Sequence, residues 1–199
     1  MLFRSSIDRV MASPMEADPV HMLECAGVGD GAAALVLRPA DEVEGGVGVA
    51  AMSVATDSYY LSGRKDICTF EAVRRAAAKA YKMAGLSPGD VDVVEVHDDT
   101  SIMGVVSLED LGFVEKGKGA SFVVDGKTVR DGELPTNAFG GLKARGHPLG
   151  ATGLYQIGEV ALQLRGDAGA CQVEGAGVGL AECLGGLGST CAVTILRSG

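Results

Sequence analysis

The stretch "GGLKARGHPLGATG", residues 140–153, places five glycines around His147 and leads into a helical pattern. Glycine at this density weakens any regular element, so it indicates tight turns or a close approach of the backbone. The stretch lacks the Gly-Lys-Ser/Thr ending of a P-loop, and it does not follow a strand with the GxGxxG spacing. A weak phosphate cradle, an active-site wall and plain close packing are the interpretations left open.

His147 is the residue of this stretch best suited to chemistry. It precedes Pro148, and proline is favoured at the first position of a helix. The ring is therefore expected near backbone N–H groups at the positive end of a helix dipole. From there a neutral imidazole can accept a proton or donate a hydrogen bond to a developing oxyanion. The alternative is a histidine that only caps the start of a helix.

The pattern on either side of the stretch predicts an α/β fold. Apolar residues at helical spacing, Leu154, Ile157, Ala161 and Leu164, predict a helix that ends at Gly166. A second helix is expected from a cap at Thr69 to "GLSPGD", and a third over residues 100–113 with Met103, Val106 and Leu111 inward. Five strands are expected over residues 27–39, 47–61, 91–97, 177–184 and 189–196. Alternating with helices, they predict a five-stranded mixed sheet covered by helices.

Two other segments are expected to be less regular. Residues 1–25 are predicted to be a linker or irregular start, which leaves 26–199 as one domain of ordinary size. Residues 115–137 form a long polar connection, with a small hairpin expected around Asp125-Gly126.

Composition and charge exclude several classes of protein. The formal charge of −9 argues against a general nucleic-acid binder, which needs a basic face. No apolar run reaches the ~20 residues of a membrane span, and the start has no secretory apolar region. The five cysteines form no CxxC pair and are odd in number, which favours reduced thiols in the cytoplasm. The three histidines lack ligand spacing, so no metal is expected.

Two further residues are candidates for chemistry. His97 ends the Val-rich strand "VDVVEV" and is followed by two aspartates, at the strand end where α/β proteins usually bind ligands. A polar loop start is the plainer interpretation of "HDD". Cys183 lies just before "LGGLG" and could shuttle protons, whereas a buried inert cysteine is the more common case. The other four cysteines are expected to be structural.

Three motifs in one order, "VHDD", "GGLKARGHPLGATG" and "ECLGGLGS", resemble the carboxyl-terminal half of the thiolase superfamily. The likeness is nearest to sterol-carrier-protein-type thiolases and archaeal acetyl-CoA acetyltransferases, and spans roughly residues 7–197. It implies a half-thiolase fold that stacks on a similar amino-terminal half, with the active site between the two. The family's nucleophilic cysteine belongs to that other half.

The resemblance also implies roles for individual residues. His147 would activate the nucleophile and contribute to an oxyanion hole, which His97 would support through a water. Cys183 falls near the family's second catalytic position. A backbone N–H of Gly185 or Gly186 would bind the acetyl oxygen, and Asn137 and Gly146 join these glycines as substrate-binding residues. A coenzyme A thioester is implied as substrate, with no bound cofactor.

The chain departs from the family pattern at several positions. Asp99 and Thr100 replace the usual Cys-Phe of the sterol-carrier type, and Glu182-Cys183 replaces a His-Asn pair. "NAFGG" stands where Asn-Pro-Ser-Gly-Gly is usual. None of the five cysteines lies where the nucleophile is required, on a strand-to-helix turn, and without one there is no covalent acyl transfer.

These features leave three functions open. The first is one half of a thiolase-type acyl-CoA acyltransferase, which needs an amino-terminal partner with the nucleophilic cysteine or associates with itself. The second is a non-catalytic thiolase-like subunit that binds acyl-CoA or scaffolds a partner protein. The third is a thiolase-fold aldolase, against which the intact "GHPLG" weighs.

Overall fold

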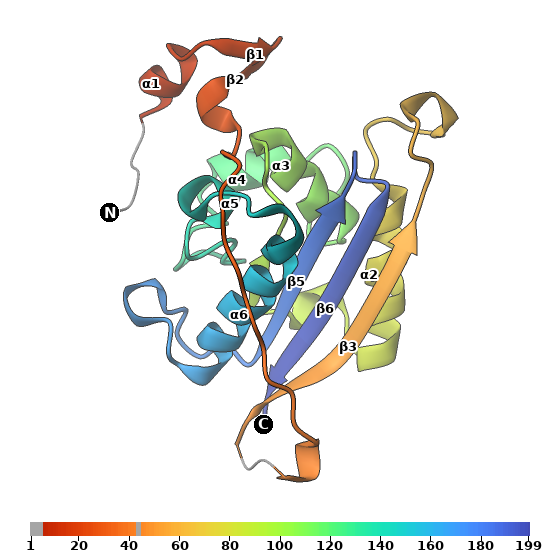
Figure 1. The fold of residues 1–199 in the computed structure, drawn as a ribbon, viewed down its shortest axis with the longest axis vertical. Coiled ribbons are helices and arrows are strands. Elements are labelled where there is room, and N and C mark those ends of the chain that lie inside the picture. The colour runs from red at the N-terminus through yellow and green to blue at the C-terminus, as the bar shows by residue number, and fades with distance from the viewer. Residues whose placement is uncertain (1–5, 43–44) are drawn as a thin grey trace.

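A four-stranded mixed sheet in the order β3-β6-β5-β4 forms the centre of the fold (Figure 1). The structure is a computed structural model and describes residues 6–42 and 45–199. The strands are β1 (Met15–Ala17), β2 (Val20–His21), β3 (Val47–Thr56), β4 (Val93–Glu95), β5 (Val178–Gly185) and β6 (Thr190–Ser198). The helices are α1 (Ile7–Met11), α2 (Glu71–Ala84), α3 (Ser101–Asp110), α4 (Gly119–Val124), α5 (Gly141–Arg145) and α6 (Thr152–Arg165).

The strand pairing brings two of the predicted site residues to the same end of the sheet. β6 pairs antiparallel with both β3 and β5, whereas β4 pairs parallel with β5. Glu95 at the end of β4 lies opposite Ala181 of β5. Because the two strands run in the same direction, His97 and Cys183 follow this pair at the same end of the sheet.

Helix α2 covers one face of the sheet, as its pattern predicts. Six of its residues are buried: Ala72, Val73, Ala76, Ala77, Ala80 and Tyr81. The helix ends at Gly85, which has the left-handed conformation typical of a C-terminal cap. The predicted cap at Thr69 is wrong, because the Thr69 hydroxyl donates to Asp66 and Phe70 occupies the cap position without a side-chain bond.

Helix α6 covers part of the opposite face, and three of its four predicted apolar residues lie against the core: Leu164 is buried, and Ile157 and Ala161 pack against the same cluster. The buried residues of its inner face include Thr152, Gln156 and Gln163, whereas Leu154 is 40% exposed. The Gln156 amide donates to the Glu182 carbonyl at 2.7 Å, and Gln163 binds the backbone of a neighbouring loop. These bonds satisfy amides that would otherwise be costly to bury. The apolar side of α6 is therefore only partly covered by its own sheet.

The first predicted strand, residues 27–39, is not part of the sheet. The segment runs extended beside α6 (Figure 1), with Leu35 close to Gly158, and carries no strand assignment. Val36 and Leu37 are 89% and 76% exposed. The mixed α/β fold is therefore confirmed, with four strands in the main sheet instead of five.

The remaining segments differ from expectation in detail. β1 and β2 form a small antiparallel pair within the predicted irregular start, whose first five residues lie outside the described ones. The hairpin expected around Asp125-Gly126 is wrong, since α4 ends there and Gly126 turns in the left-handed region. Helix α3 buries Leu108 as well as the predicted Leu111, which follows it, whereas Met103 and Val106, also predicted to face inward, are only partly buried. Among the described residues, no helix is long and apolar enough to cross a membrane.

Candidate active site

His147 is held from its side chain and its backbone. It lies between α5 and α6, and its Nδ1 is 2.7 Å from the Thr152 hydroxyl oxygen. Thr152 begins α6 and is fully buried, so the helix start fixes the ring. Among the described residues no hydrogen bond reaches Nε2 of His147, which leaves this nitrogen for a ligand. The role of Thr152 has no signal in the sequence except its place in the motif.

The glycines around His147 allow close contact between backbone segments, one of the roles that their density indicated. The N–H of His147 donates to the Gly27 carbonyl at 2.8 Å, and Gly29 donates back to His147 at 3.3 Å. Gly146 has φ of +85°, a conformation that favours glycine, and a Cβ there would lie 3.5 Å from the Gly27 oxygen. The segment around Gly27, expected to be a strand, thus forms one wall of the loop.

His97 and Cys183 meet His147 in space. The His97 and His147 rings pack edge to face with centroids 5.0 Å apart. The Cys183 sulfur lies 3.8 Å from His97 Nδ1. The structure therefore brings together the three candidate catalytic residues, which are separated by up to 86 positions in the chain.

Burial keeps two of these groups uncharged near neutral pH. Burial, then the neighbouring His147 and Arg145, lowers the pKa of His97 to about 4. Burial and the nearby Glu182 raise the pKa of the Cys183 thiol to about 11. A thiol with that pKa is poor as a thiolate nucleophile, but it can hold and release a proton when a stronger base forms beside it.

Glu182 holds the backbone of His97 in place, a role that its position in the sequence did not predict. Its carboxyl is fully buried and accepts the His97 backbone N–H at 2.8 Å and the Ser107 hydroxyl at 3.4 Å. Burial raises the pKa of Glu182 to about 8, so the group is mostly neutral at pH 7. The residue beside Cys183 in sequence thus fixes the backbone of His97 in space.

Asp98 and Asn137 are used to hold the loops together. Asp98 accepts the Leu142 N–H at 2.8 Å, and burial raises the pKa of Asp98 to about 6. Gly141 has φ of +63°, and a Cβ there would collide with the Asp98 carboxylate. The Asn137 amide both accepts from and donates to the Val96 backbone. Asn137 therefore orders the strand end.

The other candidate binding residues lie at the turn after β5. Gly185 ends β5 opposite Thr190, and Gly186 begins the turn with φ of +60°. The turn is close to aromatic residues, since a Cβ on Gly188 would lie 2.6 Å from the Phe70 ring. This contact joins the end of β5 to the segment before α2.

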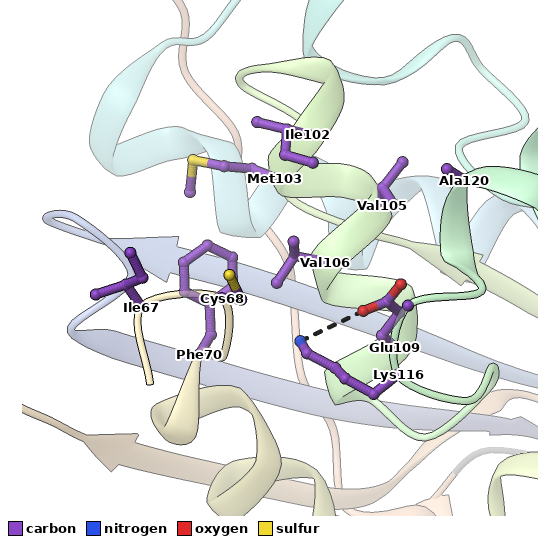
Figure 2. Close-up of a pocket in the computed structure, with 11 residues that line it drawn as sticks. Ile67, Cys68, Phe70, Ile102, Met103, Val105, Val106, Glu109, Lys116 and Ala120 are labelled. Carbon is purple, nitrogen blue, oxygen red and sulfur yellow. Dashed lines mark ion pairs between the residues drawn. The ribbon is translucent and has the colours of Figure 1, made fainter. Parts of the chain in front are cut away.

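An apolar pocket of about 500 Å³ opens next to this turn (Figure 2). In Figure 2, Ile67 and Phe70 from the segment before α2 face Met103 and Val106 of α3. An ion pair of 3.4 Å between Lys116 and Glu109 closes the far side. Cys68, expected to be structural, is exposed and lines this pocket.

No metal site emerges from this geometry. Within residues 6–42 and 45–199, no three His, Cys, Asp or Glu side chains are grouped so that they could hold an ion. The groups gathered at this site are two imidazoles and one thiol, with the backbone N–H groups of the turn after β5 nearby.

Comparisons with known proteins agree with the order of the motifs. A family profile described as "Thiolase C-terminal domain-like" matches residues 53–198. The chain is 51% identical over 194 residues to an acetyl-CoA acetyltransferase of Methanothermobacter thermautotrophicus, covering 96% of this chain and 51% of that protein. It is 39% identical to human sterol carrier protein 2 over 203 residues, covering 98% of this chain and 37% of that protein.

A solved structure shows the same fold. It is titled "Ltp2-ChsH2(DUF35) aldolase" and superposes with a TM-score of 0.82 over 98% of this chain and 51% of that one, at 20% sequence identity. At that identity the likeness concerns the fold alone. The chain spans about half the length, or less, of the proteins named here.

Proposed function

Since the chain belongs to the thiolase family, in which it corresponds to the carboxyl-terminal domain, we propose that it is one half of an acyl-CoA acyltransferase. The reaction is Claisen condensation or thiolysis of a 3-oxoacyl-CoA. The observation that carries this proposal is the convergence of His147, His97 and Cys183 at one end of the sheet. If the three residues had separate structural roles, they would not need to lie next to one another.

In the direction of thiolysis, each group has one task. His147 takes the proton from a cysteine thiol of the amino-terminal half, and the thiolate attacks the C3 carbonyl of the substrate. The bond between C2 and C3 breaks, and Cys183 gives its proton to C2 of the departing acetyl-CoA. The thiol of a second coenzyme A then returns a proton to Cys183 and takes the acyl group from the nucleophile, and the cysteine thiolate that is released recovers its proton from His147. His147 directly, and His97 through a water, would donate hydrogen bonds to the thioester oxygen.

The surroundings of the three residues support an acyl thioester as substrate. The apolar pocket between Phe70 and Met103 would take the acyl chain, because it lies beside the turn that contains Gly186. The neutral Cys183 thiol suits a proton donor to a carbanion and does not suit the covalent nucleophile. The five free cysteines are in keeping with a reducing compartment such as the cytoplasm.

Replacing Cys183 by serine tests this division of labour. We expect Cys183→Ser to slow thiolysis of acetoacetyl-CoA by the assembled enzyme roughly 10²-fold, since a hydroxyl is a much weaker acid than a thiol. Cys171→Ser is the matched control, because Cys171 is also partly buried but lies in a loop beyond α6. A rate unchanged by Cys183→Ser would mean that this thiol is only packed.

A second test uses the close contact between α6 and Cys183. A Cβ on Gly153 would lie 3.2 Å from the Cys183 sulfur, whereas one on Gly158 meets only Leu35, at 3.9 Å. We expect Gly153→Ala to displace the thiol by a few tenths of an ångström and to cost roughly tenfold in rate. Gly158→Ala adds the same methyl group to the same helix and should leave the rate unchanged. Equal rates for the two variants would contradict the role of the thiol.

The non-catalytic alternative predicts different results for these substitutions. A thiolase-like subunit that only binds acyl-CoA would retain binding, yet none of these substitutions would alter a turnover rate. Asp99 is the feature that favours it, because a carboxyl with one buried and unpaired oxygen stands where the sterol-carrier type has a cysteine. The intact group of His147, His97 and Cys183 favours the enzyme.

A further inference from the structure

A short segment near the start of the described chain, Cys25–Gly29, crosses the two loops that carry the histidines. We call this segment the site strap. Its Ala26 N–H donates to the Asp99 carbonyl at 2.7 Å, and Cys25 lies opposite Thr100 in an isolated antiparallel bridge. Both partners belong to the loop that follows β4 and begins with His97. The strap therefore holds this loop by its backbone, two to three residues beyond the ring.

The other half of the strap pairs with the loop that contains His147. The His147 N–H donates to the Gly27 carbonyl at 2.8 Å, and the Gly29 N–H donates to the His147 carbonyl at 3.3 Å. Val28 and His147 form an isolated parallel bridge for this reason. The strap thus pairs with the His97 loop at one end and with His147 itself at the other.

Lys143 fastens the strap from the side of α5. Its Nζ donates to the Cys25 carbonyl at 2.6 Å, and the side chain is half-buried. A hydrogen bond from an ammonium group is stronger than one between neutral groups. Because Lys143 precedes His147 by four residues, this bond ties the His147 loop to the end of the strap that holds the His97 loop.

The strap contributes little to the core, so its hydrogen bonds need another reason. Val28, its largest apolar side chain, is 76% exposed. The two loops also meet directly, where Asp98 accepts the Leu142 N–H at 2.8 Å. One such contact sets a distance but leaves the loops free to rotate about it, whereas a second contact at another point also fixes their orientation. Catalytic groups need both to be fixed.

We propose that Lys143 and the site strap are positioning elements, which hold the His97 and His147 loops in the orientation that places the two rings 5.0 Å apart. The strap acts through main-chain hydrogen bonds to both loops, and Lys143 keeps it seated. The effect on rate rests on the proposed function, whereas the effect on ring geometry does not.

Histidine-selective NMR of the full chain tests the geometry. The chain has three histidines, so a histidine-labelled sample gives few ring signals, and His21→Gln assigns the one outside the site. We expect a cross-peak between the His97 and His147 rings in the parent. Lys143→Met keeps the apolar stem but removes the bond to Cys25, so it should abolish the cross-peak. Lys143→Arg, whose guanidinium can donate to the same carbonyl, should restore it.

A second pair of variants tests the strap itself. Ala26→Pro removes the N–H that binds Asp99, and it should also abolish the cross-peak. The preceding Cys25 is already extended, with φ of −92° and ψ of 140°, which is the conformation that a following proline requires. Gly27→Ala is the matched control, because a Cβ there would meet no atom within 4 Å and the Gly27 carbonyl is retained. It should leave the cross-peak unchanged.

Several outcomes would overturn the proposal. A cross-peak that persists in Lys143→Met or in Ala26→Pro would show that the strap is not needed for the ring geometry. Loss of the cross-peak in Gly27→Ala or in Lys143→Arg would show that the effect is not specific to these bonds. Circular dichroism of each variant completes the test, since unfolding of Lys143→Met or Ala26→Pro would mean that the strap supports the whole fold and not the two loops.

The kinetic readout is kept separate from the structural one. In the assembled enzyme, Lys143→Met and Ala26→Pro should each lower kcat at least ~10-fold with little change in KM, because misplaced groups affect the reacting step rather than binding. Lys143→Arg and Gly27→Ala should stay close to the parent. Loss and recovery of the cross-peak in a protein without acyl-transfer activity would sustain the strap and refute the function.

Discussion

Replacing His147 by alanine is expected to lower the rate of acyl transfer by the assembled enzyme at least ~10²-fold. The substitution removes an activating base and a hydrogen-bond donor to the oxyanion together. The fold should be retained, because the ring contributes one side-chain hydrogen bond, to Thr152, while the backbone bonds to Gly27 and Gly29 remain. The rate of acetoacetyl-CoA thiolysis by free coenzyme A at 25 °C measures the loss of activity. A thermal unfolding scan of the same variant measures whether the fold is retained.

Two further variants serve as a control and as a comparison for His147→Ala. His21→Gln removes a histidine that contacts Glu24 rather than the site, and it should leave the rate unchanged. His97→Ala should cost less than His147→Ala, because its proposed role acts through a water and not by direct proton transfer. Addition of imidazole should restore part of the activity of His147→Ala. A near-normal rate for His147→Ala would remove the central assignment, and a larger loss for His97→Ala would reverse the order of the two.

Much of this site could be predicted from local sequence. The valine-rich strand predicts that His97 lies at the end of a strand. The glycine-rich stretch predicts that His147 lies in the turn before a helix. Parallel pairing of β4 with β5 then brings His97 to Cys183, a contact that depends only on strand direction and register. The resemblance to thiolases named the same three residues.

The partners that hold these residues in place could not be predicted. Thr152 and Glu182 are polar residues on elements whose apolar pattern dominates the prediction. Glu182 binds the His97 backbone 85 residues away, whereas Thr152 binds the ring of His147 only five residues before it. A pattern that scores only apolar periodicity treats such buried polar residues as the outer face of a helix or strand.

Helix α6 also buries polar residues that its apolar pattern did not predict, and this has a consequence for assembly. The helix turns Gln156 and Gln163 inward, where they bind backbone groups, so Leu154 and Leu162 remain 40% and 37% exposed. On the same side of the sheet, Met52 and Val54 of β3 are 57% and 60% exposed. We call these four residues the open face.

The open face indicates an interface rather than ordinary surface. Large exposed apolar patches are uncommon on proteins that work as monomers, so four exposed apolar side chains on one side of the sheet favour an interface there. The extended segment with Val36 and Leu37 lies beside α6 and adds to the apolar area (Figure 1). Two kinds of occupant fit, a thiolase-like amino-terminal half or a second copy of this chain. We expect the former, because the site holds a base and a proton donor but no suitable nucleophile.

The purified 199-residue chain is therefore expected to associate with itself or with such a half, and to show no thiolysis of acetoacetyl-CoA alone. None of its cysteines can hold the acyl group in contact with His147, since Cys183 carries a strongly bound proton and Cys68 lines the separate apolar pocket. Adding a thiolase-like amino-terminal half that bears the nucleophilic cysteine should restore turnover from background. Sedimentation and the acetoacetyl-CoA assay, with and without that half, measure both properties.

A charge placed on the open face separates assembly from chemistry. Val54→Lys would bury an unpaired ammonium group on association and should weaken binding of the other half at least ~10-fold, a cost of the size expected for such a group. Val124→Lys is the matched control, because Val124 is 85% exposed at the end of α4 and lies outside the open face. At saturating partner, Val54→Lys should recover the parent kcat, since it leaves His147, His97 and Cys183 in place. A monodisperse monomer that cleaves acetoacetyl-CoA unaided would contradict this architecture, because the nucleophile would then have to come from the chain itself.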